Sequence, residues 1–363
     1  MAGAVAGGLL LAPPAQAAGI AIVGTTINNG KPIVMGAGGS TTVTVPVVTE
    51  IAGVSGAPAT VDAELTGLGS GFSVFLEGTS GANMTCVATT RTTSTCTCTA
   101  VVHQPEVDNS YAGHPVQLRI HGYAGGHQYL LYRDAADNVP LLKQTRTATA
   151  NATPETARKG STLTVTGQLT PPDWNHYGAD GGKVSVGYSG QAVKLQFQKA
   201  GSTTWSTART VTSGSKGSLR TTVGVSTSGV WRWSFAGSGT SAASVSAGDG
   251  VTLYKVAKLR VDASPEPVAK GGKLPVTGRL TWATTDAATT FVGYPHQLVR
   301  LQFRRSGSAT YTTVTYARTD AKGNVKTTTT AKAVGFWRWA FAGTTTVAPV
   351  APVAAGGDRV ALR

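Results

Sequence analysis

Aromatic residues alternate with small or charged residues in two closely related stretches of the chain. Trp231, Trp233 and Phe235 take every second position of residues 229–237 (GVWRWSFAG), and residues 335–343 (GFWRWAFAG) repeat the pattern. Side chains alternate between the two faces of a β-strand. Each stretch is therefore predicted to be a strand with its aromatics on one face and its arginine on the other. We expect these aromatics to centre a core in each copy.

The two stretches belong to a longer internal repeat. Residues 163–170 (LTVTGQLT) correspond to 274–281 (LPVTGRLT), residues 191–197 (QAVKLQF) correspond to 297–303 (QLVRLQF), and both copies end in the pattern G-D-x-V-x-L. The corresponding segments lie about one domain length apart in the chain, so the repeat has the size of a domain rather than of a solenoid unit. The order of its predicted strands is that of an immunoglobulin-like sandwich, in which strand C neighbours the aromatic strand F.

The chain ahead of the repeats contains short strand-like runs separated by glycine-rich turns. Strands are predicted at 41–48, 72–76, 96–102, 116–121 and 128–133. Pro46 lacks an amide hydrogen and predicts an edge position for its strand. The predicted fold class is therefore all-β, with three tandem β-sandwich domains at 18–145, 146–258 and 259–363.

Residues 1–17 are predicted to be a secretory signal peptide. Positions 1–12 are small and apolar, two prolines follow, and Ala15-Gln16-Ala17 forms a small-x-small cleavage site, although the basic n-region is missing. The apolar run is too short to span a bilayer. We expect a secreted, extracellular protein without a membrane span.

The cysteines lie close together in the first domain, at Cys86, Cys96 and Cys98. In an exported protein the simplest arrangement is one hairpin disulfide of Cys86 with Cys96 or with Cys98. The spacing of cysteines and histidines matches no metal-ligand motif. We therefore predict no metal and no cofactor.

Charge is unevenly distributed along the chain, whose formal net charge is +14. Residues 146–258 carry 12 basic and 4 acidic residues and residues 259–363 carry 14 and 5, whereas residues 1–145 carry 5 and 8. Basic faces attract polyanions. A role in solubility alone is the alternative, and composition does not separate the two.

The outward faces of the predicted strands C and F carry basic residues in both repeats. They are the candidate polyanion-binding residues: Lys194, Arg232, Arg300, Arg304 and Arg338. The alternative is a solvated sheet face on which the arginines cover apolar surface.

A second group of candidates lies in the long connection between strands B and C of each repeat. Its aromatics are Trp174 and Tyr177 in the first repeat and Trp282 and Tyr294 in the second. Exposed loop aromatics could stack on sugar rings. In the alternative interpretation, the connection folds back and plugs one end of the sandwich.

Catalytic motifs are weak. Ser213 and Lys216 match an S-x-x-K pattern, but they lie in a glycine-rich turn and not in the helix that this chemistry requires. We predict that the protein is not an enzyme. Export and the lack of a nucleic-acid-binding motif also count against nucleic acid as a partner.

The motifs K-G-x-x-L-x-V-T-G-x-L-T, G-Y-x-x-Q-x-V-x-L-Q-F, G-x-W-R-W-x-F-A-G and G-D-x-V-x-L lie within residues 146–363. This set resembles the tandem immunoglobulin-like domains of secreted actinobacterial (Streptomyces-type) proteins, mostly uncharacterised and sometimes labelled calcium-binding. The resemblance implies export and a bacterial immunoglobulin-like fold, and no defined activity. Calcium binding would need an acidic loop, and the best segment, 134–138 (DAADN), lacks the required spacing.

These observations favour a non-catalytic exported protein that acts as a cell-envelope or extracellular binding or spacer module. Its basic sheet faces are expected to contact anionic wall polymer. The alternative function is a carbohydrate-recognition accessory module that uses the loop aromatics.

Overall fold

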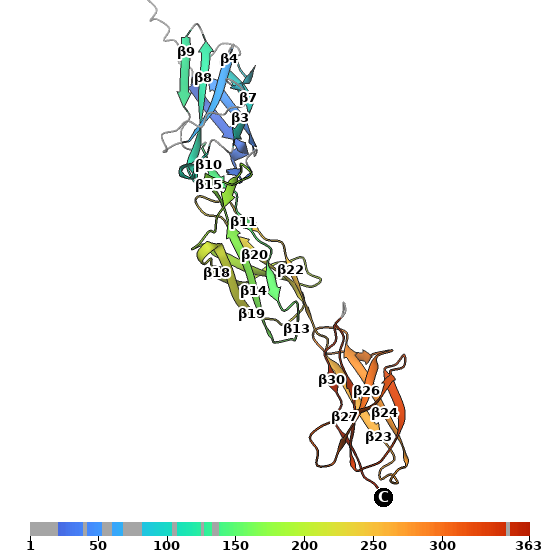
Figure 1. Ribbon diagram of the computed structural model, residues 1–363. Helices are drawn as coiled ribbons and strands as arrows, with labels where there is room; N and C mark the ends of the chain where they lie inside the picture. Colours follow the sequence, from blue (N-terminus) through green and yellow to red (C-terminus); the bar gives the residue numbers. More distant parts are fainter. Residues whose placement is uncertain are drawn as a thin grey trace, which may run out of the picture. The chain divides into compact units, whose positions relative to one another are not determined.

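The computed structural model describes residues 21–38, 42–52, 60–67, 82–103, 107–124, 127–132, 138–345 and 349–363 (Figure 1). Strands dominate this part of the chain, and its helical elements are short 3-10 turns such as Asn109–Tyr111 (η3) and Ser215–Gly217 (η5). The prediction of an all-β protein made of β-sandwich domains is confirmed.

The first domain is a sandwich of two sheets. One sheet has the strand order β1 (Ala21–Ile27), β3 (Thr42–Ala52), β7 (Thr93–His103), β6 (Thr85–Ala88). The other has the order β2 (Ile33–Met35), β10 (Val139–Lys143), β8 (Pro115–Ala124), β4 (Thr60–Gly67), β5 (Ala82–Asn83), with β9 (His127–Tyr132) beside β8. The strands predicted at 41–48, 96–102, 116–121 and 128–133 are confirmed for the described residues, which leave out 41 and 133, and 72–76 lies outside them.

The edge position predicted from Pro46 is wrong, because β3 lies between β1 and β7. Pro46 is opposite Thr99 of β7, whereas the pairing of β3 with β1 ends one residue away, at Val47 opposite Ile27. Pro46, which has no amide hydrogen, therefore lies outside the part of β3 that is paired on both sides. A proline is tolerated in this inner strand because β1 is short.

One disulfide joins β6 and β7. It links Cys86 to Cys96, which are directly opposite in the strand register, and this selects the first of the two predicted pairings. Cys98, two residues further along β7, is a half-buried free thiol, and burial raises its pKa to about 11. It is therefore protonated at neutral pH and a poor nucleophile.

Each repeat is also a two-sheet sandwich. In repeat 1, one sheet contains β12 (Asn151–Thr153), β14 (Thr162–Thr170) and β19 (Ser218–Gly224), and the other has the order β13 (Thr156–Ala157), β22 (Asp249–Leu253), β20 (Gly229–Phe235), β17 (Ala192–Lys199), β18 (Ser206–Thr212). In repeat 2, one sheet contains β23 (Ala257–Ala263), β24 (Lys273–Ala283), β25 (Phe291–Gly293) and β28 (Asn324–Thr330). The other contains β27 (Thr312–Arg318), β26 (Leu298–Arg305), β29 (Gly335–Phe341), β30 (Val353–Ala354) and β31 (Asp358–Val360). The predicted C and F strands, β17 with β20 and β26 with β29, are neighbours, as expected for an immunoglobulin-like sandwich.

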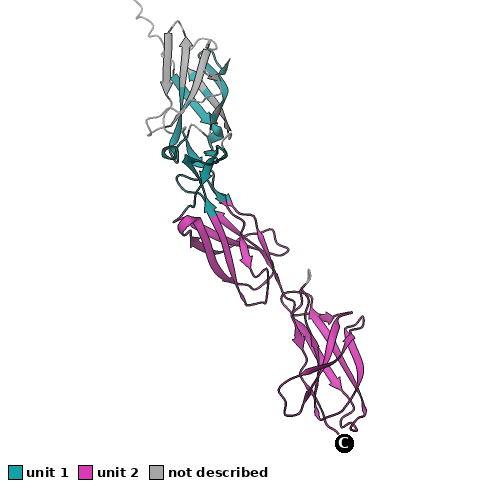
Figure 2. Ribbon diagram, viewed as in Figure 1, with its two compact units in different colours: residues 1–146, 169–188, 235–244 teal, residues 147–168, 189–234, 245–363 magenta. Residues whose placement is uncertain are grey.

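The chain separates into two compact units (Figure 2). Unit 1 comprises residues 1–146, 169–188 and 235–244, and unit 2 comprises residues 147–168, 189–234 and 245–363. The segment 169–188, which comprises the end of β14 in repeat 1 and the connection after it, thus belongs with the first domain.

The aromatic strand centres the core of each repeat, as predicted. In β20 the residues Trp231, Trp233 and Phe235 are buried, and Arg232 between them is half-buried on the other face. The indole Nε1–H of Trp233 donates to the carbonyl oxygen of Thr166 at 2.9 Å, across the sandwich. A Cβ placed on Gly167 would lie 2.6 Å from the Trp233 ring, so the glycine of the V-T-G motif gives the indole its room.

Repeat 2 has the same arrangement in β29. Trp337, Trp339 and Phe341 are buried, and Nε1 of Trp339 donates to the carbonyl oxygen of Thr277 at 3.1 Å. In both repeats the first tryptophan differs from the second. The buried Nε1 atoms of Trp231 and Trp337 have no hydrogen-bond partner within the described residues.

This difference predicts unequal effects of the same substitution. Trp233→Phe removes a buried donor and leaves the Thr166 carbonyl without it, whereas Trp231→Phe removes a donor that has no partner. We expect Trp233→Phe to cost about 1 kcal/mol more free energy of unfolding. Amide hydrogen exchange of β14 and β20 in the full chain should therefore be roughly fivefold faster for Trp233→Phe than for Trp231→Phe. Equal exchange in the two variants would contradict the role assigned to the indole bond.

Candidate functional site

The residue between the two core tryptophans of repeat 1 is held by two contacts. Nε of Arg232 donates to Oε1 of Gln196 on the neighbouring strand β17 at 2.9 Å. Its guanidinium carbon lies 3.8 Å from the centre of the Trp205 ring. Such a cation–π contact stabilises by about 0.5–2 kcal/mol, depending on exposure. Arg232 is therefore fixed in place over an aromatic surface.

Repeat 2 contains the same group of residues. Nε of Arg338 donates to Oε1 of Gln302 at 2.9 Å, and its guanidinium carbon lies 3.7 Å from the centre of the Tyr311 ring. We call Arg232 and Arg338 the clamped arginines. Their Nη groups have no hydrogen-bond partner in the described part of the chain, so these donors remain available to a ligand.

The other predicted polyanion-binding residues differ from one another in their surroundings. Lys194 and Arg300 are exposed, two residues before the glutamines that hold the clamped arginines. Arg304 is half-buried: its Nη1 donates to the carbonyl oxygen of Ser308 at 2.6 Å and its guanidinium carbon lies 4.4 Å from the centre of the Phe336 ring. Lys194 and Arg300 are thus open to solvent, while Arg304 covers apolar surface.

The prediction that Trp174 is an exposed loop aromatic is wrong. Trp174 lies in β15 (Pro172–Tyr177), which pairs with β16 (Lys183–Ser185), and its side chain is 0% exposed. It belongs to the apolar cluster of the first domain. The connection does plug a sandwich, as in the alternative interpretation, but the sandwich is that of the preceding domain.

Polar contacts hold this plug in place within unit 1. Oδ1 of Asn109 accepts from the backbone amide of Trp174 at 2.9 Å and from Nζ of Lys143 at 2.6 Å. Nδ2 of Asn109 donates to Oδ1 of Asp173 at 2.6 Å. Burial lowers the pKa of Lys143 despite the nearby Asp173 carboxylate. Burial would raise the pKa of Asp173, but hydrogen bonds from Asn109, Asn175 and His176 outweigh it and lower the pKa overall.

The other predicted stacking residues do not form one surface. The Tyr177 side chain is 55% exposed, and Nζ of Lys183 lies 3.6 Å from the centre of its ring. Trp282 stacks on Tyr294 with ring centres 4.9 Å apart, and both are partly buried against the core of repeat 2. In repeat 2 the connection therefore packs on its own domain.

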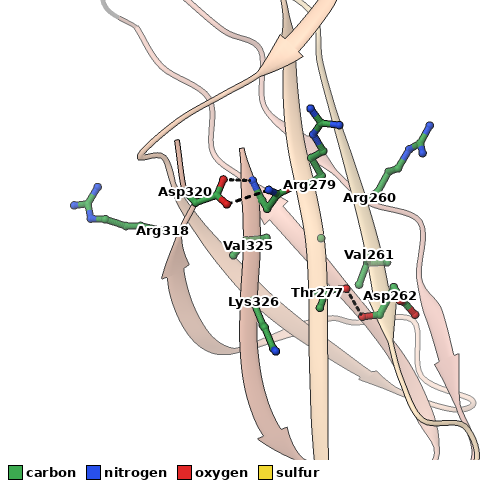
Figure 3. Close-up of a pocket in the computed structure, with 11 residues that line it drawn as sticks. Arg260, Val261, Asp262, Thr277, Arg279, Arg318, Asp320, Val325 and Lys326 are labelled. Atoms are coloured by element: carbon green, nitrogen blue, oxygen red, sulfur yellow. Dashed lines mark hydrogen bonds between the residues drawn. The ribbon is translucent and has the colours of Figure 1, made fainter. Parts of the chain in front are cut away.

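An open groove of about 720 Å³ lies on the β23–β24–β28 face of repeat 2. Its basic lining residues are Arg260, Arg279, Arg318 and Lys326 (Figure 3). None of these four residues was among the candidate polyanion-binding residues, which came from strands C and F. A signal was available in the repeat itself, because Arg279 occupies the position of Gln168 in repeat 1.

Among the described residues, no group of three or more His, Cys, Asp or Glu could hold a metal ion, and 134–137 of the acidic segment lie outside them. None of the helices among them is long and apolar enough to cross a membrane.

No protein-family model matches the sequence, and no curated protein matches it. Solved structures to which the chain is similar include the three N-terminal domains of the bacteriophage RB49 highly immunogenic outer capsid protein, with 11% identity, a TM-score of 0.34, and coverage of 95% of this chain and 100% of that one. The N-terminal eight immunoglobulin domains of Down syndrome cell adhesion molecule share 11% identity at a TM-score of 0.32, covering 95% of this chain and 36% of that one. The FN1–FN3 domains of chicken CNTN1 share 10% identity at a TM-score of 0.25, covering 94% and 98%. Similarity at this level carries no inference about activity or ligand.

The burial of Trp174 predicts that its truncation weakens the first domain. Trp174→Ala should lower the free energy of unfolding there by about 3–5 kcal/mol, because a large core side chain is lost. The readout is faster hydrogen exchange in β10 of the full chain. Tyr177→Ala in the same hairpin is the matched control and should leave β10 unchanged. Unaltered protection in Trp174→Ala would show that the plug is dispensable.

Proposed function

We propose that this chain is a non-catalytic exported protein that acts as an extracellular binding or spacer module. It contacts an anionic polymer of the cell envelope through basic sheet faces in its two repeats. One observation carries this proposal: a clamped arginine beside an exposed cation occurs at equivalent positions of both repeats, as Arg232 with Lys194 and Arg338 with Arg300.

The clamp suits an arginine to anion binding. Because Nε is already bonded to a glutamine and the guanidinium rests on a ring, little side-chain freedom remains to be lost when the Nη groups meet an anion. The neighbouring lysine or arginine adds a second, mobile charge. A polymer with repeated negative groups could use both copies, which raises its overall affinity without any new kind of contact.

Export is supported by two further features. Residues 1–17 have the pattern of a signal peptide. The Cys86–Cys96 disulfide fits an oxidising compartment. The motifs shared with secreted actinobacterial proteins favour a bacterial cell envelope as the setting.

The carbohydrate alternative has lost its main support. Trp174 is enclosed in a core, and Trp282 is stacked on Tyr294. Only Tyr177 among the four candidates is largely exposed. No described surface brings these aromatics together as a platform for a sugar, so we do not propose this function.

The proposed function predicts retention on isolated Gram-positive cell walls at low ionic strength and release by salt, because contacts between exposed charges are screened. Lys194→Gln/Arg300→Gln should reduce retention severalfold, and Arg232→Gln/Arg338→Gln should reduce it as well. Lys199→Gln/Arg305→Gln removes the same charge from later exposed positions of the same strands and is the control. A sedimentation assay gives the bound fraction. Absent or salt-insensitive retention of the unaltered protein would refute the proposal.

A further inference from the structure

The groove on repeat 2 contains two arginines that face each other on adjacent strands. Arg260 of β23 is directly opposite Arg279 of β24 in the strand register. Directly opposed residues in an antiparallel pair have Cβ atoms about 4.5–5.5 Å apart, and like charges there are destabilising. Both side chains are exposed, and both extend from the sheet toward the top of Figure 3.

No ion pair or hydrogen bond in the described part of the chain compensates this pair. Neither guanidinium has an ion-pair or hydrogen-bond partner there. Two carboxylates line the same groove, and one of them is already engaged. Asp320 accepts from the side chain and backbone of Asn324 at 3.0 and 2.8 Å and from the backbone of Lys322 at 2.8 Å. These bonds, led by the Asn324 side chain, lower the pKa of Asp320.

The second carboxylate is that of Asp262, at the other end of the groove from Asp320 (Figure 3). The backbone oxygen of Asp262 accepts from Oγ1 of Thr277 at 3.4 Å. With Arg318 and Lys326, the lining carries four cations against two carboxylates, so the groove has a net positive charge.

Repeat 1 shows that the fold does not require the arginine pair. The register Asn151 opposite Thr166 in repeat 1 matches Asp262 opposite Thr277 in repeat 2. At the corresponding sequence positions, repeat 1 has Thr149, which precedes β12, and Gln168 of β14 where repeat 2 has Arg260 and Arg279. Nε2 of Gln168 instead donates to the carbonyl oxygen of Lys216 at 3.0 Å. The pair is therefore a property of repeat 2 alone.

We propose that this groove binds a phosphodiester polymer, with one phosphate bracketed between Arg260 and Arg279. The two non-bridging oxygens of a phosphodiester can accept from two guanidinium groups at once, one on each side. Lys326 extends to another side of the groove, where it meets a neighbouring phosphate of the same polymer (Figure 3). Nη1 of Arg318 already donates to the carbonyl oxygen of His296 at 3.0 Å, so Arg318 adds positive charge at the edge of the groove. The open shape suits a polymer that passes over the sheet better than an enclosed ion. This assignment rests on the proposed function and names the chemistry of its polymer.

The test measures binding of synthetic poly(glycerol phosphate) to the full chain by calorimetry at low ionic strength. The variant Arg260→Thr/Arg279→Gln installs the residues that repeat 1 already carries in the same fold. We expect its Kd to be roughly tenfold weaker. The control Arg305→Gln/Lys332→Gln removes the same charge from exposed positions outside the groove, and its Kd should change less than about twofold. If the two variants lose polymer affinity equally, binding depends on net charge alone and the proposed site is wrong.

A second probe tests the ligand class. Poly-glutamate of matched charge should bind more weakly than poly(glycerol phosphate) and should respond less to Arg260→Thr/Arg279→Gln. Equal affinity and equal response would overturn the phosphodiester assignment. Thermal unfolding of the same variants checks the fold, and the double substitution should leave the transition unchanged or raise it, because the opposed charges are removed.

Failure of this site and failure of the proposed function give different results. If the unaltered protein is retained on cell walls and Arg260→Thr/Arg279→Gln keeps full polymer affinity, the proposed function holds and the groove is not the binding site. If that variant loses polymer affinity but the unaltered protein is not retained on cell walls, the groove is a phosphodiester-binding site and the cell wall is not its target.

Discussion

The packing of one tryptophan against one glycine fixes which face of the aromatic strand lies in the core of each repeat. The indole of Trp233 or Trp339 reaches across the sandwich to a backbone carbonyl, and this approach requires glycine at 167 or 278. A one-residue shift of the strand would bring arginine into the core in place of tryptophan. The same constraint therefore buries the aromatics and directs Arg232 and Arg338 outward, where the candidate site lies.

Outward arginines are used in two different ways in this protein. The clamped arginines are held by a glutamine and an aromatic ring, so their charge has a fixed place on the C–F face of both repeats. Arg260 and Arg279 oppose each other without compensation, on the other sheet of repeat 2. The first arrangement stabilises the sheet by itself, while the second gains from an added anion. The sandwich that the two repeats have in common thus carries one basic surface present in both repeats and one present only in repeat 2.

Duplication has also given one connection two structural roles. In repeat 1 the segment after β14 carries Trp174 into the core of the first domain, and a network around Asn109 holds it there. In repeat 2 the corresponding segment packs Trp282 on Tyr294 of its own domain. The first domain consequently depends on a hairpin supplied by the next one. An aromatic residue in a loop is therefore weak evidence for a binding surface until its neighbours are known.

The sequence by itself determined the all-β class, the duplicated sandwich, the neighbouring C and F strands and the outward direction of Arg232 and Arg338. These follow from period-two patterns, from an internal repeat and from the strand order of an immunoglobulin-like sandwich, all of which can be read along the chain without knowing its contacts. Only the tertiary structure decided that Trp174 is core, that Pro46 lies in an inner strand, that Cys96 rather than Cys98 is bonded, and that Arg260 faces Arg279. Each of these depends on which strands lie side by side. Contacts between residues that are far apart in the chain are set by strand pairing and sheet packing, which the local sequence does not specify.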